Sequence, residues 1–241
     1  MLKAARDDLP RKALAEFVGT AFLLIAVIGS GIAAQRLSPN DTGLQLFENA
    51  AATAAALVAI ILAIGPASGA HLNPVVTLAD RFFGGVSTAE TGVYVVAQFA
   101  GAVTGAIVAN LMFSLPAVEL STKHRSGGGL WLAEGVATLG LLLVVFGVVR
   151  SGRTSAAPFA VGAYIGGAYF FTSSTSFANP AVTAARTLSN TFAGIAWQSA
   201  PAFVLAQLGG AVLAVLVVAV LYPRVADVAP AVLLPHEEPS R

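Results

Sequence analysis

The sequence contains no cysteine and very few charged residues. Its 241 residues include 13 Lys and Arg and 12 Asp and Glu, so only 10% of the chain is charged. The absence of cysteine excludes disulfides, thiolate metal sites and cysteine nucleophiles. A net charge of +1 provides no electrostatic footprint for nucleic acid. Soluble domains carry roughly 25% charged residues, so the composition also excludes an ordinary soluble domain.

The sequence has long uncharged stretches instead, since 56% of its residues are apolar and the mean hydropathy is +0.80. A membrane-spanning helix needs about 20 mostly apolar residues. We therefore expect six spans, at 12–34, 48–66, 90–115, 130–149, 157–173 and 200–221. Two of the uncharged runs are too long for one helix, and in each run the surplus stretch contains an Asn-Pro pair.

Three short motifs recur in the same order in the second half of the chain. The paired segments are 15–20 and 133–138, 73–77 and 179–183, and 97–102 and 206–211. This recurrence divides a single domain, 1–241, into two repeats, 12–115 and 130–222, each with three spans and one Asn-Pro segment. Because three is odd, the second repeat enters the membrane from the opposite side. Inverted repeats with broken helices place their working site near the midplane of the bilayer.

The basic residues predict the orientation of the chain in the lipid bilayer. With both termini in the cytoplasm, nine of the thirteen Lys and Arg residues lie on the inside. We therefore expect a multi-pass protein of the cell inner (plasma) membrane. The end of the chain, 223–241, is rich in proline and predicts a flexible tail.

The two Asn-Pro segments predict a pore. Asn is a suitable helix cap and Pro suits the first helical turn, so half-helices are expected at about 74–82 and 180–188. Helices this short cannot span a bilayer and are tolerated at membrane depth only inside protein or beside water. If they enter from opposite faces, their positive ends and the amides of Asn73 and Asn179 converge on one point. Such a point disfavours cations and offers hydrogen bonds to small neutral solutes.

These motifs resemble those of aquaporins, the major intrinsic protein family. The resemblance covers about residues 12–222 and rests on AEFVGT at 15–20, SGAHLNPV at 68–75 and NPA at 179–181. It implies an all-α right-handed bundle of six transmembrane helices with two re-entrant half-helices, arranged as an inverted 3+3 repeat. It also implies a passive channel for water and small neutral solutes, with one pore in each subunit of a homotetramer. We expect no enzymatic activity, cofactor or metal. The midplane motifs are Asn73-Pro74-Val75 and Asn179-Pro180-Ala181.

Three ionisable residues within the motifs are expected to support the pore. Glu16 and Glu134 are the carboxylates that we place inside spans, where a buried charge must be hydrogen-bonded. Both are expected to bind N–H groups of the irregular segments before Asn73 and Asn179. His71 is expected to brace or line the cytoplasmic pore mouth, and a pH gate is the alternative.

In relatives, four positions form a second constriction towards the outside of the membrane. Counting from the two Asn-Pro pairs places them at Thr53, Gly167, Ser176 and Val182. Water-selective relatives carry an aromatic residue, a His and an Arg among these positions, whereas this sequence carries none of them. We therefore expect a wide, uncharged filter. This pattern looks like the bacterial aquaporin branch found with arsenic-resistance genes, which implies arsenite and methylated arsenicals as cargo in addition to glycerol-like polyols.

Arg186 allows two interpretations. It lies four residues after Val182, on the same face of the short helix and about one turn nearer the outside, where it would add positive potential to the pore mouth. The alternative is an arginine that extends to the membrane interface. The effect of Val75, which stands where Ala is usual, is not predicted.

Three other functions remain as alternatives to an arsenite-conducting channel. A plain water and glycerol facilitator fits the same motifs. An ion-coupled transporter would need an ionisable pair at the midplane, which the sequence does not suggest. An intramembrane serine hydrolase would have to use Ser68 and His71, which lack a convincing third partner.

Overall fold

The computed structural model describes residues 8–223, and this part of the chain consists of helices joined by loops. The six long helices are α2 (Leu9–Leu37), α3 (Thr42–Ser68), α5 (Thr88–Met112), α6 (Gly128–Arg150), α7 (Ala157–Phe171) and α9 (Ala200–Leu221). The short helices are α4 (Pro74–Phe83) and α8 (Pro180–Ala185), and one-turn 3-10 helices occur at Thr154–Ala156 and Arg186–Leu188. The predicted all-α bundle is confirmed. The predicted tail lies outside the described residues, except for its first position.

Five of the long helices are long and apolar enough to cross a bilayer. The exception is α7, which has 15 residues and therefore rises only about 22 Å. A 3-10 turn precedes it directly, so the helical segment runs from Thr154 to Phe171.

Several helix ends follow directly from the local sequence. The Asp41 carboxylate accepts a hydrogen bond from Leu44 N–H and caps α3, which ends at Gly69 in the left-handed conformation. Ser87 and Glu90 form a reciprocal capping box at the start of α5. Glu90 also accepts a 2.8 Å hydrogen bond from Lys12, which ties the first turns of α2 and α5 together.

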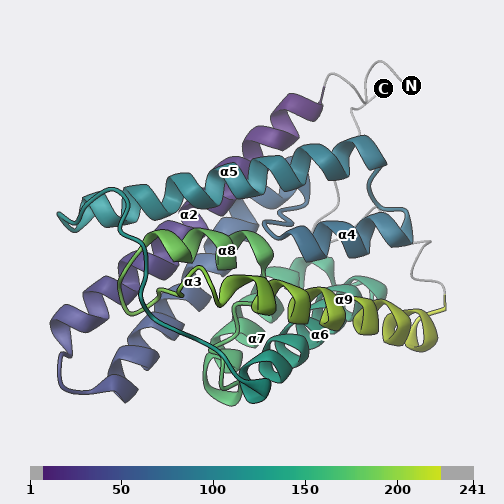
Figure 1. The fold of residues 1–241 in the computed structure, drawn as a ribbon. Helices are drawn as coiled ribbons and strands as arrows, with labels where there is room; N and C mark the ends of the chain where they lie inside the picture. The colour runs from purple at the N-terminus through teal and green to yellow at the C-terminus, as the bar shows by residue number, and fades with distance from the viewer. Residues whose placement is uncertain (1–7, 224–241) are drawn as a thin grey trace.

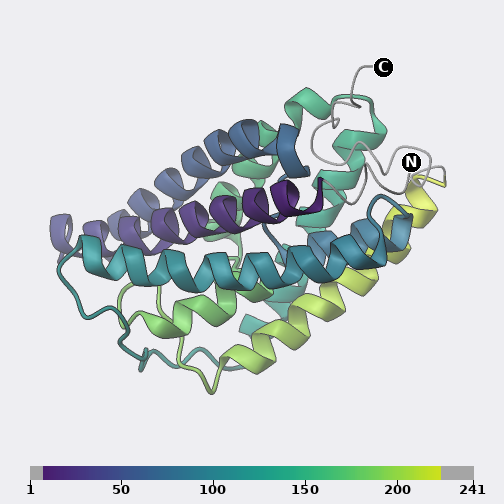
Figure 2. The same ribbon diagram turned by 90° about the horizontal axis from the view of Figure 1, so that it is seen from above.

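The helices of the two halves pack in the same way. Helix α2 contacts α3 and α5, whereas α6 contacts α7 and α9, and α3 meets α7 across the two halves. The short helices α4 and α8 lie between α5 and α9, with α4 at the right and α8 at the left in Figure 1. Seen from above, the long helices run along the length of an elongated bundle (Figure 2).

Two glycines allow α2 and α5 to approach closely. A Cβ at Gly101 would lie 2.2 Å from the carbonyl oxygen of Phe17, and one at Gly105 would lie 2.2 Å from that of Ala21. In the second half, a Cβ at Gly210 of α9 would lie 2.4 Å from the carbonyl oxygen of Gly135 in α6. Small residues at helix contacts are typical of membrane bundles, where packing replaces the hydrophobic effect as the driving force for helix association.

The surface of the bundle is apolar and its interior carries polar groups. Large apolar side chains such as Val96, Leu205 and Val220 are at least two-thirds exposed. By contrast, Glu16 and Glu134 are completely buried. This distribution suits a lipid environment around the bundle, because exposed apolar patches of this extent are rare on soluble monomers.

Candidate functional site

The loops that precede α4 and α8 have the same unusual backbone. Ala70 and Leu72 have φ values of 49° and 51°, and Ser176 and Ala178 have values of 49° and 46°. Left-handed conformations at non-glycine residues are uncommon and persist only where the surroundings hold them. In both loops they expose consecutive backbone N–H groups to a buried carboxylate.

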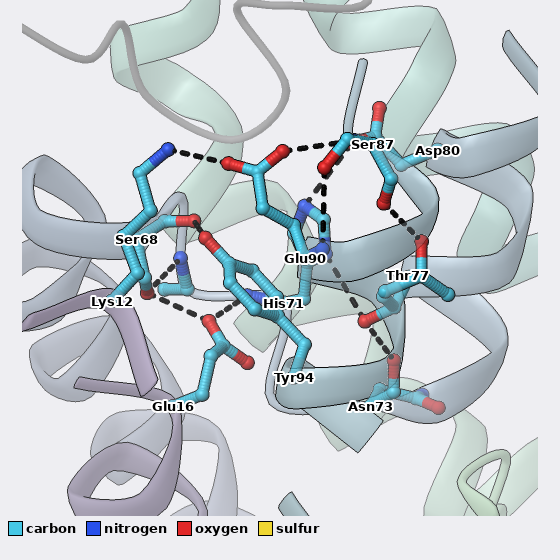
Figure 3. Close-up of polar contacts among 12 residues, drawn as sticks. Lys12, Glu16, Ser68, His71, Asn73, Thr77, Asp80, Ser87, Glu90 and Tyr94 are labelled. Carbon is cyan, nitrogen blue, oxygen red and sulfur yellow. Dashed lines mark hydrogen bonds and ion pairs between the residues drawn. The ribbon is translucent and has the colours of Figure 1, made fainter. Parts of the chain in front are cut away.

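Glu16 and Glu134 hold these loops. Glu16 accepts hydrogen bonds from the backbone N–H of His71, at 2.9 Å, and from the hydroxyl of Ser68 (Figure 3). It also accepts from the backbone N–H of Leu72 at 2.7 Å. Glu134 accepts from Phe177 and Ala178, at 2.8 and 2.9 Å, and from Ser174. Each carboxylate also accepts from a glutamine of the third long helix of its half, Gln98 or Gln207. Such a set of donors compensates for burying the charge.

Asn73 and Asn179 join the two halves at the centre. The side-chain oxygen of each caps its own half-helix, by accepting from Val75 N–H in α4 and from Ala181 and Val182 N–H in α8. The Asn73 amide nitrogen donates to the carbonyl of Ala178, and that of Asn179 donates to the carbonyl of Leu72, both at 2.8 Å. Each amide therefore uses one N–H across the two halves, and within residues 8–223 its second N–H has no partner.

A cavity of about 60 Å³ lies beside these two asparagines. Leu23, Val27, Leu57, Ile61, Leu141, Val145, Val161 and Ile165 form its apolar wall. The polar groups come from Thr53, His71, Asn73, Tyr169, Ser176, Asn179 and Arg186. At roughly 10–15 Å³ for each water molecule, the volume accommodates about four to six. A lining with both polar and apolar side chains suits neutral solutes that have both kinds of surface.

The structure brings three of the four predicted filter residues to this cavity. Thr53, Ser176 and Val182 line it, and all three are at least 95% buried. Gly167 does not line it and lies on the exposed side of α7. Helix α7 instead presents Ile165 and Tyr169 to the cavity, and the Tyr169 hydroxyl lies 3.2 Å from that of Thr53.

Arg186 is buried beside the cavity. Its side chain is 2% exposed, and its Nε donates to the carbonyl oxygen of Ala193. Its guanidinium carbon lies 3.4 Å from the centre of the Phe177 ring. This burial differs from that of an arginine that extends to the membrane interface, and it brings a charged group to the cavity lining.

Two further cations lie in the loop after α5. Arg125 donates to the carbonyl of Gly194 at 3.0 Å, and its guanidinium lies 5.2 Å from the Phe177 ring. Lys123 donates to the carbonyl of Phe192 at 3.0 Å. Burial, together with repulsion from Arg125 and Arg186, lowers the pKa of Lys123 to about 8. Neither residue lines the cavity.

His71 is a further polar residue of the cavity lining. Its Nδ1 lies 3.1 Å from the Thr77 hydroxyl and its Nε2 lies 3.5 Å from the Asp80 carboxylate, whereas Tyr94 packs its ring against the imidazole (Figure 3). Ser68 is fully buried and its hydroxyl donates a hydrogen bond to Glu16, so it is not arranged as a nucleophile.

Replacing Asn179 with Asp is expected to weaken the junction between the halves. Asp keeps the acceptor that caps α8, but it places a carboxylate oxygen where the amide donates to Leu72. We expect the free energy of unfolding to fall by about 2 kcal/mol, measured by thermal unfolding in detergent. Asn40→Asp, in the exposed loop between α2 and α3, is the control. An unchanged Tm for Asn179→Asp would contradict the role of this bond.

The order of these elements and their paired motifs match a known family. The model of the family described as Major intrinsic protein matches residues 3–178, which is more than half of the chain. The chain belongs to the major intrinsic protein family. The resemblance inferred from its motifs is therefore confirmed, and as an aquaporin it is a passive channel of the membrane and not an enzyme.

Relatives of this aquaporin cover most of its length. It is 48% identical over 207 residues to the aquaglyceroporin AqpS of Rhizobium meliloti (strain 1021), covering 86% of this chain and 88% of the relative. It is 32% identical over 232 residues to the probable aquaporin AqpM of Archaeoglobus fulgidus, covering 86% and 94%. Its fold is similar to the X-ray structure of the aquaglyceroporin from Plasmodium falciparum, with a TM-score of 0.70, 22% identity and coverage of 90% and 98%.

Tyr169 is the pore residue of this aquaporin that counting from the motifs missed. A periodic signal was present, because Val161, Ile165 and Tyr169 are spaced four residues apart and share one face of α7. All three line the cavity. The four-residue spacing of these side chains therefore locates the pore face of α7 better than counting residues back from Asn179 does.

Proposed function

We propose that this aquaporin is an aquaglyceroporin-type channel that conducts water, glycerol-like polyols, arsenite and methylated arsenicals. The observation that carries the proposal is Val182, which stands at the filter position where relatives carry Arg and contributes a small apolar side chain to the cavity wall. The similarity to a relative described as an aquaglyceroporin supports the same substrate class. Neutral As(OH)₃ is a compact polyol-like solute, so a pore for glycerol has the size and polarity to pass it.

The cavity provides the two kinds of contact that a polyol needs. Its carbon backbone can lie against the apolar side chains from α2, α3, α6 and α7, and its hydroxyls can meet Asn73, Asn179 and Ser176. The first turns of α4 and α8 add positive potential at the same level. Cations lose hydration there without gaining a carboxylate from the cavity lining, which favours neutral cargo.

We place the channel in the inner membrane as a homotetramer with both termini in the cytoplasm. In this orientation His71 borders the cytoplasmic half of the pore and Arg186 its outer half. The apolar exposed faces of the long helices are suited both to lipid and to neighbouring subunits. The proposed repeats, 12–115 and 130–222, each contribute one half of the pore.

The experiment is a stopped-flow panel on proteoliposomes, with water, glycerol, urea and arsenite as solutes. Fluxes of glycerol and arsenite well above those of empty vesicles support the proposal. Passage of water alone, with glycerol and arsenite both excluded, would overturn it. Passage of glycerol without arsenite identifies a plain facilitator, and dependence on an ion gradient identifies a coupled transporter.

Restoring an arginine at the filter is expected to narrow the pore. Val182→Arg adds a guanidinium to the cavity wall, so we expect glycerol and arsenite flux to fall about tenfold, which corresponds to about 1.4 kcal/mol of barrier. Water flux should change far less, because water is smaller. Val182→Thr, which nearly conserves the side-chain volume, is the control. Equal loss of flux in both variants would show a general disturbance rather than narrowing.

A further inference from the structure

The guanidinium of Arg186 has hydrogen-bonding capacity that the protein does not use. Its Nε is bound to the Ala193 carbonyl, but its two terminal nitrogens have no hydrogen-bond partner among the residues that the structure describes. Within residues 8–223 it also forms no salt bridge. A buried cation with unsatisfied donors is costly unless something in its site accepts those donors.

The position of Arg186 makes the pore content the acceptor. The residue is 98% buried yet lines the cavity, together with Val182 on the same face of the short helical segment. Four residues along a helix correspond to a rise of about 6 Å. Arg186 therefore lies about one helical turn away from Val182, the position at which the pore is wide.

The contacts around Arg186 fix it in this position. The ring of Phe177 lies against its guanidinium, and the carbonyl of Ala193 orients Nε. An aromatic face and a carbonyl together keep the N–H donors of an arginine oriented. Neither partner is a carboxylate, so the positive charge is not cancelled. A cation on the way through the pore must pass this charge.

We propose that Arg186 is the charge-selecting residue of this channel and that selection by charge is separated along the pore from selection by size. Val182, Ser176 and the paired hydroxyls of Thr53 and Tyr169 set the width, whereas Arg186 repels cations and donates hydrogen bonds to the oxygens of neutral solutes. This inference rests on the proposed function, because it requires that the cavity conducts solute.

The test is potassium leak in proteoliposomes that carry Arg186→Gln. Glutamine keeps hydrogen-bond donors but lacks the charge, so we expect the leak to rise about tenfold or more. Arg125→Gln is the matched control, since Arg125 also lies near Phe177 and binds the same loop without lining the cavity. An unchanged leak in Arg186→Gln, or an equal rise in Arg125→Gln, would overturn the inference.

Arg186→His tests the same charge within one protein. Histidine has an unperturbed pKa of about 6.5, and burial near Arg125 lowers the pKa of a cationic side chain, so the variant is neutral at pH 8. We expect its potassium leak at pH 8 to be about tenfold above that of the wild type. A leak equal to that of the wild type at pH 8 contradicts the inference even if Arg186→Gln does not fold. If the wild type passes neither water nor glycerol, the proposed function fails instead.

Discussion

Glu134→Gln is expected to abolish solute flux and to lower the free energy of unfolding by about 3 to 5 kcal/mol. The Glu134 carboxylate is fully buried and accepts hydrogen bonds from Ser174, Gln207 and two backbone N–H groups. A glutamine amide can orient only one oxygen towards these donors and turns its own NH₂ against the rest. The loop from Ser174 to Ala178 then loses the support for its left-handed residues. Thermal unfolding in detergent and glycerol flux in proteoliposomes measure the two effects.

Glu119→Gln is the control for this experiment. Glu119 lies in the exposed loop after α5 and accepts a single hydrogen bond, from Asn190. Its neutralisation should change the free energy of unfolding by less than about 0.5 kcal/mol. If Glu134→Gln were as stable and as permeable as Glu119→Gln, the carboxylate would not be what holds the loop.

Gly101→Ala is expected to cause the second largest loss, by forcing α2 and α5 apart. The added methyl would lie 2.2 Å from the Phe17 carbonyl oxygen, and a backbone atom cannot move aside as a flexible side chain can. We expect a loss of about 2 to 3 kcal/mol from overpacking. Because Glu16 and Gln98 meet across the same two helices, glycerol flux should fall with stability.

Gly92→Ala supplies the matched control on the same helix. Nothing lies within 4 Å of a Cβ at this position, so alanine adds helix propensity without a clash. We expect its Tm to be equal to or slightly above that of the wild type, since Ala is favoured over Gly by up to about 1 kcal/mol in a helix. Similar losses of stability in both variants would show that the close contact between Gly101 and Phe17 does not cause the loss.

The parts of the site that depend on local chemistry could be predicted from the sequence. Asn and Pro define where α4 and α8 begin, because capping and the missing N–H of proline act over one turn. A carboxylate within an apolar span needs hydrogen-bond donors. This requirement predicts that Glu16 and Glu134 bind N–H groups of the loops before Asn73 and Asn179. The long helices follow from uninterrupted apolar length.

The parts that depend on loop geometry could not be predicted. The placement of Gly167 assumed no insertion between α7 and Asn179, and the count fell on a residue that does not line the cavity. The choice between the two interpretations of Arg186 depended on the Ala193 carbonyl, which follows a turn that the sequence does not specify. Both outcomes depend on contacts between segments and not on the preference of any single residue.

The crossed bonds of Asn73 and Asn179 impose an order on assembly. Glu16 finds all its partners within the first half of the chain, so the first loop can be held before the second half is made. The Asn73 amide, however, donates to Ala178, and the Leu72 carbonyl accepts from Asn179. Both partners lie more than a hundred residues later in the chain. In a bilayer such groups need water or protein until then. Closure of the pore centre therefore cannot precede synthesis of the second half of the chain.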